Sequence, residues 1–326
     1  MLTLQKSNFW FPNQELHKKS ATQNFSMESI RESWLILIST PIYCFIIGIE
    51  LILSNIQHRR IYTKKNVAAN VYLMFLNMGL DLGLRVFTLG ILGYFFKFAI
   101  ISWQTGILYW VLLFVLEDMM YYWLHRFDHE IRLFWAVHVT HHSSDLMNFT
   151  VGFRSSVFQP IYRFMYFIPI VLMGFNPLDL LFVYAITQIW GIFVHTEYIR
   201  KMGWLEYILV TPSHHRVHHG SNPKYLDKNM GMFLIVWDKL FGTFQPELSE
   251  DEYEPIRYGL TKNLENPNAV TLVFHEWEQV WKDVTQKNLP FKARLNYLFG
   301  PPGWSHDGSR QTSVQMREIE QAKTKN

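Results

Sequence analysis

Residues 105–124 read TGILYWVLLFVLEDMMYYWL, an apolar run that ends directly before His125. About 20 apolar residues in a helix suffice to cross the hydrocarbon core of a bilayer, so this stretch predicts a membrane-spanning helix. Such a helix would deliver His125 to a membrane boundary. The aromatic residues at positions 121–123 fit that boundary, because amphipathic rings concentrate at the membrane–water interface. The run therefore favours a membrane fold with polar chemistry at one end of a helix.

The composition of the whole chain also indicates a membrane protein. The 326 residues are 49% hydrophobic, 17% aromatic and 17% charged, whereas about 25% of the residues of a soluble domain are charged. The formal net charge of +3 is small and the basic residues are scattered, so we expect no nucleic-acid partner. The single cysteine, Cys44, excludes an intramolecular disulfide and a cysteine-rich zinc module.

Other apolar blocks predict further membrane helices. The block from Trp34 to Ser54 is long enough to span, and the basic residues that follow it are typical of a short cytosolic loop. A block from Val67 to about Ile101 carries Asp81 and Arg85 at a spacing that allows an ion pair on one helix face. We expect this block to cross once or to break near its glycines at 90 and 93.

A helical hairpin is predicted next, from residues 157–174 and 178–195, with its turn at Asn176-Pro177. Its second arm would return His195 to the side of the membrane where His125 lies. We therefore expect an all-α fold, a multi-pass transmembrane helix bundle with a helical cytosolic cap that holds a histidine-rich dimetal site.

The chain divides into four predicted parts. They are a polar N-terminal segment (1–33) without the pattern of a cleaved signal peptide, a membrane-embedded catalytic domain (34–244), a cytosolic C-terminal extension (245–302) and a tail (303–326) whose polar composition predicts disorder. Within the extension, Val270, Phe274, Trp277, Trp281 and Val284 are spaced three or four apart. This spacing predicts a helix that packs on the cap or lies on a membrane, and packing is the favoured role.

Ten of the fourteen histidines lie between residues 125 and 219, in HxxxH, HxxHH and HxxHH boxes with two further histidines beside them. Residues three or four apart are neighbours on a helix surface, so each box presents its imidazoles together. Imidazole suits zinc, copper, iron and nickel, and this many exceed the ligands of one zinc site. We expect two metal ions. The predicted ligands are His125, His129, His138, His141, His142, His195, His214, His215, His218 and His219.

The four other histidines, His17, His58, His275 and His306, are predicted to have ordinary structural roles. His129-Glu130 resembles the start of the HExxH zinc-protease helix, but position 133 is leucine, so the second ligand is missing. The sequence has neither a P-loop lysine motif nor GxGxxG, so nothing in it supports nucleotide or flavin chemistry.

The ligand set favours iron over zinc. Neutral imidazoles leave the charge of the ions uncompensated and available for binding and reducing oxygen, and the Glu-x-x-His pattern of soluble di-iron bundles is absent. Acidic residues beside the boxes are candidates for accepting a hydrogen bond from the outer ring nitrogens. They are Glu117, Asp118, Asp128, Glu130, Asp145 and Glu197, of which the first two are favoured because carboxylates at the end of an apolar helix are costly unless paired. We expect no catalytic side chain beyond the metal ligands.

The boxes and their flanks resemble the fatty acid hydroxylase/sterol desaturase superfamily of membrane di-iron oxygenases, most of all its alkylglycerol monooxygenase branch. The matching stretches are EDMMYYWLHRFDHE (117–130), FWAVHVTHHSSDLMNFTVGFRSS (134–156), HTEYIRKMGWLEYILVTPSHHRVHHGSN (195–222) and YLDKNMGMFLIVWDKLFGTF (225–244). The resemblance implies two Fe²⁺ ions held by the histidines named above, and oxygen-dependent hydroxylation or desaturation of a lipid C–H bond. For that branch it also implies cleavage of an ether through a hemiacetal, with tetrahydrobiopterin as electron donor.

The resulting hypothesis is a lipid hydroxylase whose partners are a lipid in the bilayer, O2 and a separate electron donor. A haem-binding His-Pro-Gly-Gly segment is absent, which favours the separate donor. The metal site is expected on the cytosolic side, of the endoplasmic reticulum membrane in a eukaryote or of the inner membrane in a bacterium. Two alternatives stay open: a desaturase on the same site, and a non-enzymatic metal-handling protein. The second is disfavoured because all boxes fall on one predicted side of the membrane.

Overall fold

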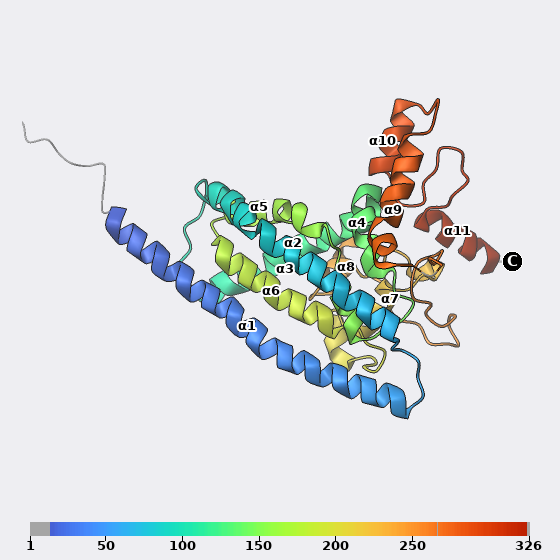
Figure 1. Cartoon of the computed structure of the whole chain (residues 1–326), viewed down its shortest axis with the longest axis horizontal. Helices are drawn as coiled ribbons and strands as arrows, with labels where there is room; N and C mark the ends of the chain where they lie inside the picture. Colours follow the sequence, from blue (N-terminus) through green and yellow to red (C-terminus); the bar gives the residue numbers. More distant parts are fainter. Residues whose placement is uncertain (1–13, 266, 325–326) are drawn as a thin grey trace, which may run out of the picture.

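The computed structural model describes residues 14–265 and 267–324 (Figure 1). Within these residues the chain is helical, with two isolated backbone bridges and no extended strand. The α-helices are α1 (Gln14–Ile56), α2 (Lys64–Phe96), α3 (Ile107–Glu130), α4 (Arg132–His142), α5 (Phe164–Leu172), α6 (Pro177–Phe193), α7 (Pro212–His218), α8 (Val236–Phe241), α9 (Ala269–Val284), α10 (Phe291–Phe299) and α11 (Ser313–Thr324). The predicted all-α class is confirmed.

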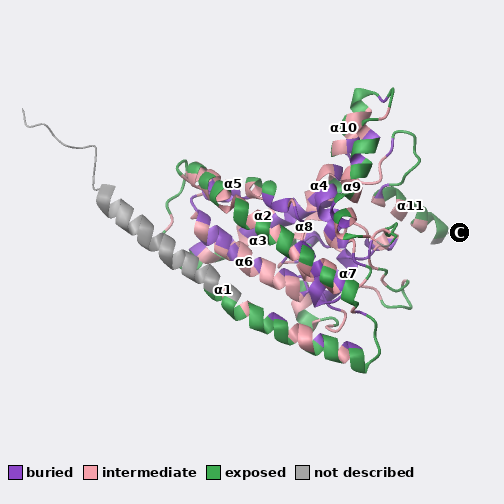
Figure 2. Cartoon of the chain, viewed as in Figure 1, coloured by how far each residue is buried: buried purple, intermediate pink, exposed green. Residues whose placement is uncertain are grey.

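Three helices are long and apolar enough to cross a membrane: α1 over Leu37–Ile56, and α2 and α3 over their whole lengths. They run alongside α6 as a bundle (Figure 1), and their outward faces leave large apolar side chains such as Phe45, Phe75 and Phe87 exposed (Figure 2). A lipid-facing surface has this character, because lipid tails are as apolar as the side chains. The first 13 residues of the predicted polar segment 1–33 lie outside the described residues, and α1 already begins at Gln14.

Helix α2 runs without a break through Gly90 and Gly93. Asp81 does not pair with Arg85 in the way that their spacing suggested; it forms an ion pair with Arg163, from the segment that precedes α5. The Arg163 guanidinium also lies 4.4 Å from the centre of the Tyr184 ring on α6. Asp81, Arg85 and Arg163 line one pocket between α1, α2 and α6, so their charges face the interior of the bundle and not the lipid.

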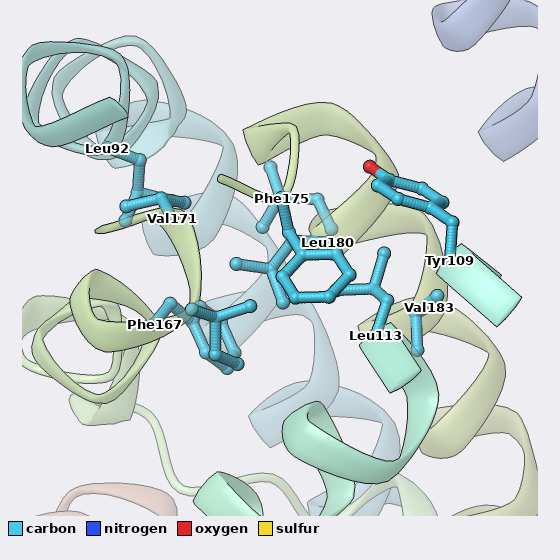
Figure 3. Close-up of a cluster of buried hydrophobic side chains, with 10 residues drawn as sticks. Leu92, Tyr109, Leu113, Phe167, Val171, Phe175, Leu180 and Val183 are labelled. Atoms are coloured by element: carbon cyan, nitrogen blue, oxygen red, sulfur yellow. The ribbon is translucent and has the colours of Figure 1, made fainter. Parts of the chain in front are cut away.

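The predicted hairpin is present, with a first arm shorter than expected. Helix α5 has only nine residues, because the chain before it forms a short 3₁₀ turn at Gln159–Ile161. Asn176 caps α6 by accepting a hydrogen bond from the Leu178 N–H, and Pro177 occupies the first turn. The two arms pack inside the bundle through a cluster of buried apolar side chains (Figure 3): Leu92, Tyr109, Leu113, Phe167, Ile170, Val171, Phe175, Leu180, Leu181 and Val183.

The end of the bundle that carries the histidine boxes is the end where α1 and α2 are connected. Arg59, in the α1–α2 loop, forms an ion pair with Glu197, and the Asn66 side chain donates to the hydroxyl of Ser144 over 2.9 Å. These contacts place the basic loop and the box segments on one side of the membrane.

The C-terminal part of the chain packs on the same end. Arg132 at the start of α4 pairs with Glu276 and Asp283 of α9 at 2.8 and 2.6 Å. The tail, for which we expected disorder, instead contains α11, whose Arg317 donates to the Leu226 carbonyl at 2.6 Å. A polar segment can be ordered by such polar contacts, which composition does not reveal. The predicted domain boundaries stay predictions.

Candidate metal centre

Four helix ends deliver the box histidines. The last two turns of α3 carry His125 and His129, and α4 carries the second box. The two helices are separated by Ile131, whose extended backbone (φ −114°) turns the chain back so that α3 and α4 face each other. His195 follows directly after α6. The third box lies on α7, which begins with Thr211 as its cap and Pro212 in its first turn.

Nine of the ten predicted ligands converge into two groups. In each group one nitrogen per ring lies within 4.8 Å of the corresponding nitrogens of the other rings. The first group is His125, His129, His138, His142 and His218, and the second is His141, His195, His215 and His219. All are buried except His141, which is half-buried.

The box pattern divides between the groups in a regular way. In each box the two histidines four residues apart belong to one group, while the third histidine of each HxxHH box belongs to the other group. His141 therefore reaches the second group from α4, and His218 reaches the first from α7. The groups are adjacent, since the rings of His142 and His219 stack with centroids 4.4 Å apart. Each HxxHH box thus contributes histidines to both groups.

Four of the outer ring nitrogens are fixed by backbone carbonyls. Because a carbonyl only accepts, the Nδ1 atom of each such histidine carries the proton and its Nε2 keeps a free lone pair. The pairs are His125 with Met230 at 2.8 Å, His141 with Arg154 at 2.9 Å, His195 with Gly191 at 2.7 Å and His218 with Lys228 at 3.0 Å.

The inner nitrogens crowd together in a way that fits metal ions. Nε2 of His125 lies 3.0 Å from Nε2 of His138, and Nε2 of His195 lies 2.9 Å from Nε2 of His215. Two imidazoles bound at right angles to one ion at about 2.0–2.1 Å have nitrogens roughly 3 Å apart. The buried Nε2 atoms of His129 and His218 have no hydrogen-bond partner, which is unusual unless an ion satisfies them.

Burial keeps these rings in the neutral form that binds metals. Burial lowers the pKa of His141 to about 4. Burial and the neighbouring histidines also hold the pKa values of His138, His142, His215 and His219 well below the usual value. At neutral pH their nitrogens are therefore available without first losing a proton.

The carboxylate that forms a hydrogen bond with a box histidine, Asp227, is one that we did not predict. Asp227 accepts a hydrogen bond from Nδ1 of His129 at 3.2 Å. Burial alone would raise the pKa of Asp227, but the hydrogen bonds from His129 and Ser313 outweigh it and lower the pKa. Asp227 has a left-handed backbone (φ 53°), so the Asp227-Lys228-Asn229 turn was the available sequence signal.

The two favoured acidic residues have other roles. Asp118 accepts hydrogen bonds from the backbone N–H groups of Phe233 and Leu234 and from the indole of Trp237. Glu117 contacts the hydroxyl of Thr187 at 3.4 Å. The expectation that these carboxylates orient histidines was wrong: Asp118 fixes the segment before α8, and both stay inside the bundle.

The remaining acidic candidates also bind other groups. Asp128 accepts from Gln159 and Tyr162 and stays 3.8 Å from Nδ1 of His138. Glu130 pairs with Arg126, and Glu197 with Arg59. Asp145 has no hydrogen bond with a histidine within the described part of the chain.

His214 is the predicted ligand that the structure does not bring to the others. Its Nδ1 lies 3.2 Å from the Leu209 carbonyl and 3.3 Å from the Thr211 nitrogen, and its Nε2 lies 4.0 Å from Glu206. These contacts support a capping role at the start of α7.

A cavity of about 890 Å³ reaches the first group from the side of the C-terminal segments. Its wall includes His129, His142 and His218, and residues of α4, α9 and the loop 259–265. The volume lies within the 300–1,000 Å³ of small-molecule sites. The centre is thus accessible to a ligand although its rings are buried.

Comparisons with known proteins agree with the histidine pattern. Residues 110–243 match the family model described as Fatty acid hydroxylase. Alkylglycerol monooxygenase of Danio rerio is 36% identical over 215 residues, which are 64% of this chain and 45% of the relative. The Homo sapiens protein of that name is 40% identical over 200 residues, 60% of this chain and 42% of the relative.

Sterol-modifying enzymes are more distant relatives. Lathosterol oxidase of Homo sapiens is 28% identical over 145 residues, 43% of this chain and 46% of the relative. The matched part of the chain thus spans less than half the length of these curated relatives, and no solved structure matches. Through residues 110–243, which hold both groups of histidines, the chain is similar to the fatty acid hydroxylase family and to the alkylglycerol monooxygenases.

Proposed function

We propose that this protein is a membrane-bound, non-haem di-iron monooxygenase that hydroxylates a lipid C–H bond and thereby cleaves alkyl ether lipids. The observation that carries the proposal is the convergence of nine imidazoles into two adjacent groups at one end of the membrane helices. The names of the relatives that are 36% and 40% identical support an alkylglycerol substrate.

The two groups would each hold one iron ion. His125, His129, His138, His142 and His218 would hold one, and His141, His195, His215 and His219 the other. When bound, the iron pair would supply the activation of oxygen that no protein side chain provides. A set of neutral ligands favours iron, whereas a structural zinc site would need only four ligands.

Polar groups around the histidines would hold each imidazole ring in one orientation. The carbonyls of Met230, Arg154 and Gly191 fix the ring orientations through hydrogen bonds to Nδ1, and such outer contacts also raise the basicity of the ligating nitrogen. Burial of the rings limits water near the centre, which protects reactive species from side reactions. The cavity beside His129 and His218 would admit the reacting carbon.

The overall reaction balances with a two-electron donor. One atom of O2 enters the C–H bond beside the ether oxygen as a hydroxyl, and the other leaves as water after taking two electrons and two protons. In the hemiacetal that results, the hydroxyl loses its proton, the C–O bond to the glycerol oxygen breaks, and that oxygen is protonated. The products are an aldehyde and a glycerol derivative. We propose a separate donor, with tetrahydrobiopterin as the candidate for this family branch.

We place the centre on the cytosolic side of the membrane. The basic loop between α1 and α2 contacts the box segments through Arg59 and Glu197, and basic loops of this length are retained on the cytosolic side. The membrane would be the endoplasmic reticulum of a eukaryote or the inner membrane of a bacterium.

Lipid mass spectrometry tests this function. Cells that produce the full chain are given an alkylglycerol, or the ester of equal chain length as a matched control, in air and without oxygen. We expect fatty aldehyde only from the ether, only in air, and not from a variant with His142→Ala and His218→Ala.

Each other outcome of the lipid experiment rejects part of the proposal. A stable lipid that has gained one oxygen would reject ether cleavage, and a lipid that has lost two hydrogens would show a desaturase, as the distant sterol relatives suggest. No change in any lipid, with metal still bound, would favour the metal-handling alternative.

A further inference from the structure

Helix α9 presents three different faces. Leu272, Val273 and Val280 are buried and hold the helix on its neighbours. His275, Glu276 and Gln279 line the cavity that reaches the histidines. The third face is apolar and exposed: Val270, Phe274 and Trp281 are 63%, 47% and 69% exposed. The residues expected to pack on the cap are thus mostly the ones that the protein leaves uncovered.

The exposed apolar character continues on α10. This helix packs against α9, and the two project together sideways from the bundle (Figure 1). Phe291, Leu295 and Phe299 are 74%, 40% and 57% exposed. We refer to Val270, Phe274, Trp281, Phe291, Leu295 and Phe299 as the α9–α10 apolar face. So many large exposed apolar side chains on two short helices usually mark a binding surface.

The position of α9 brings this face close to a membrane helix. Leu73 of the membrane helix α2 is completely buried in a cluster with Leu272 and Val273 of α9. Within one turn of Leu73, Phe75 is 56% exposed on the surface of α2. Helix α9 therefore packs directly on a helix that is long and apolar enough to cross the membrane.

The polar residues around the face fit a phospholipid surface. Lys287 and Lys292 are exposed on the α9–α10 connection and on α10. An in-plane helix buries aromatic and aliphatic residues at the level of the headgroups and keeps lysines beside the phosphates.

We propose that α9 and α10 lie in the interfacial layer of the bilayer that α1–α3 cross, with the α9–α10 apolar face inserted among phospholipids. Helix α9 also forms part of the cavity wall. Contact with the bilayer would therefore fix the position of one wall of the cavity that leads to the histidines. This proposal does not depend on the identity of the metal or on the reaction.

Site-directed spin labelling of the full chain tests the placement. In a Cys44→Ser background, single nitroxides are attached at Phe274→Cys and Trp281→Cys on the face. Matched controls carry labels at Glu278→Cys and Lys282→Cys, which lie on the same helix and are 63% and 59% exposed as side chains. The protein is reconstituted in vesicles of phosphatidylcholine with a minor share of phosphatidylglycerol, and an unchanged helical circular dichroism spectrum shows that each variant is folded.

Collision rates with apolar O2 and with a water-soluble nickel chelate give the result. We expect the ratio of O2 to nickel collisions to be several-fold higher at positions 274 and 281 than at the controls, because O2 concentrates in lipid. Equal ratios at all four positions would place the face in water and overturn the proposal. Labels at 274 and 281 that neither reagent reaches would show a covering protein surface, which would also overturn it.

Discussion

Single contacts to the outer ring nitrogens decide how the histidines present their inner nitrogens. At His129 the contact is a hydrogen bond to a carboxylate, that of Asp227 at 3.2 Å, whereas the Asp128 carboxylate stays 3.8 Å from Nδ1 of His138. A charged acceptor strengthens the donor ability of the opposite nitrogen more than a carbonyl does. We therefore infer that Asp227 is a positioning residue and would act on metal affinity through His129.

We expect Asp227→Asn to weaken metal binding by roughly 10- to 100-fold. Asparagine tolerates the left-handed backbone at this position (φ 53°), so the change removes the charge and leaves the turn. Competition with a chelator measures the affinity. The matched control is Ser313→Ala, which removes the other hydrogen bond to Asp227 and leaves the carboxylate on His129. Equal loss of affinity in both variants would mean that Asp227 acts only by holding α11.

Gly152 is a second residue on which the site depends. A Cβ at this position would lie 2.9 Å from the Ile192 Cα and 3.1 Å from Nδ1 of His195. We expect Gly152→Ala to push His195 away from its group and to lower the metal content of that group. The control is Gly79→Ala, where a Cβ meets nothing within 4 Å. Full metal content in purified Gly152→Ala protein would contradict this prediction.

The buried histidines predict an acid-sensitive apoprotein. Burial lowers the pKa of His141 from 6.5 to about 4 in the folded chain. Between these values the unfolded chain binds more protons, so stability is complete above about pH 6.5 and falls toward pH 4, by at most about 1.4 kcal/mol per pH unit for each such group. Thermal unfolding of metal-free protein between pH 7.5 and 4.5 measures the slope. We expect a smaller slope for His141→Gln, and an unchanged slope would show that other groups cause the loss.

Residue type and spacing were enough to find the nine converging histidines, because imidazoles at helical spacing share a face. Residue type and spacing could not predict that the carbonyls of Met230, Gly191 and Arg154 accept from the histidines. Every residue has a carbonyl, and only the path of the backbone decides which carbonyls lie beside the rings. The same path explains why Glu117 and Asp118 failed as candidates. Their sequence neighbourhood is that of His125, but they bind Thr187 and the segment before α8.

At the scale of elements, Arg132 connects α4 to α9. It is only 2% exposed and pairs with Glu276 and Asp283. Removal of one partner from a buried ion pair costs about 3–5 kcal/mol, because the other charge is left without compensation. We expect Arg132→Ala to lower the thermal unfolding midpoint clearly and to loosen the cavity wall. Since Arg310 still holds Asp283, the loss should lie at the lower end of that range.

The control for this prediction is Arg257→Ala. Both side chains of its ion pair with Glu254 are exposed to solvent, and such pairs contribute about 0–1 kcal/mol to the free energy of unfolding. Differential scanning fluorimetry in detergent compares the two variants. If both shift the midpoint equally, α9 is not held on α4 by Arg132.

The helices differ in whether their own sequence or contacts with distant parts of the chain determine them. Hydropathy alone predicted α1, α2 and α3, because length and apolar content decide whether a helix can span. The start of α5, the order of α11 and the placement of α9 depend on contacts between residues far apart in the chain. These are Arg163 with Asp81, Ser313 with Asp227, and Leu272 with Leu73. A periodic apolar pattern on α9 indicated an amphipathic helix, but it does not tell lipid from protein as the partner.

At the scale of the whole molecule, the membrane helices bring all the histidine boxes to one end of the bundle. All box segments and the α1–α2 loop lie at one end of the bundle, as the contact of Arg59 with Glu197 shows. We expect a cysteine at His58, in a Cys44→Ser background, to react with a membrane-impermeant maleimide only when the cytosolic side is accessible. A matched cysteine at Thr105, in the α2–α3 connection, should react only from the opposite side. Labelling of both positions from the same side would contradict this topology.

The central claim is that the histidine boxes form two metal sites, and metal analysis of the purified full chain tests it most directly. We predict two iron ions per chain in the unaltered protein and about one in each of two double variants, His142→Ala with His218→Ala for the first group and His195→Ala with His215→Ala for the second. Unchanged iron content in either double variant, or fewer than two ions per chain in fully loaded unaltered protein, would contradict the account.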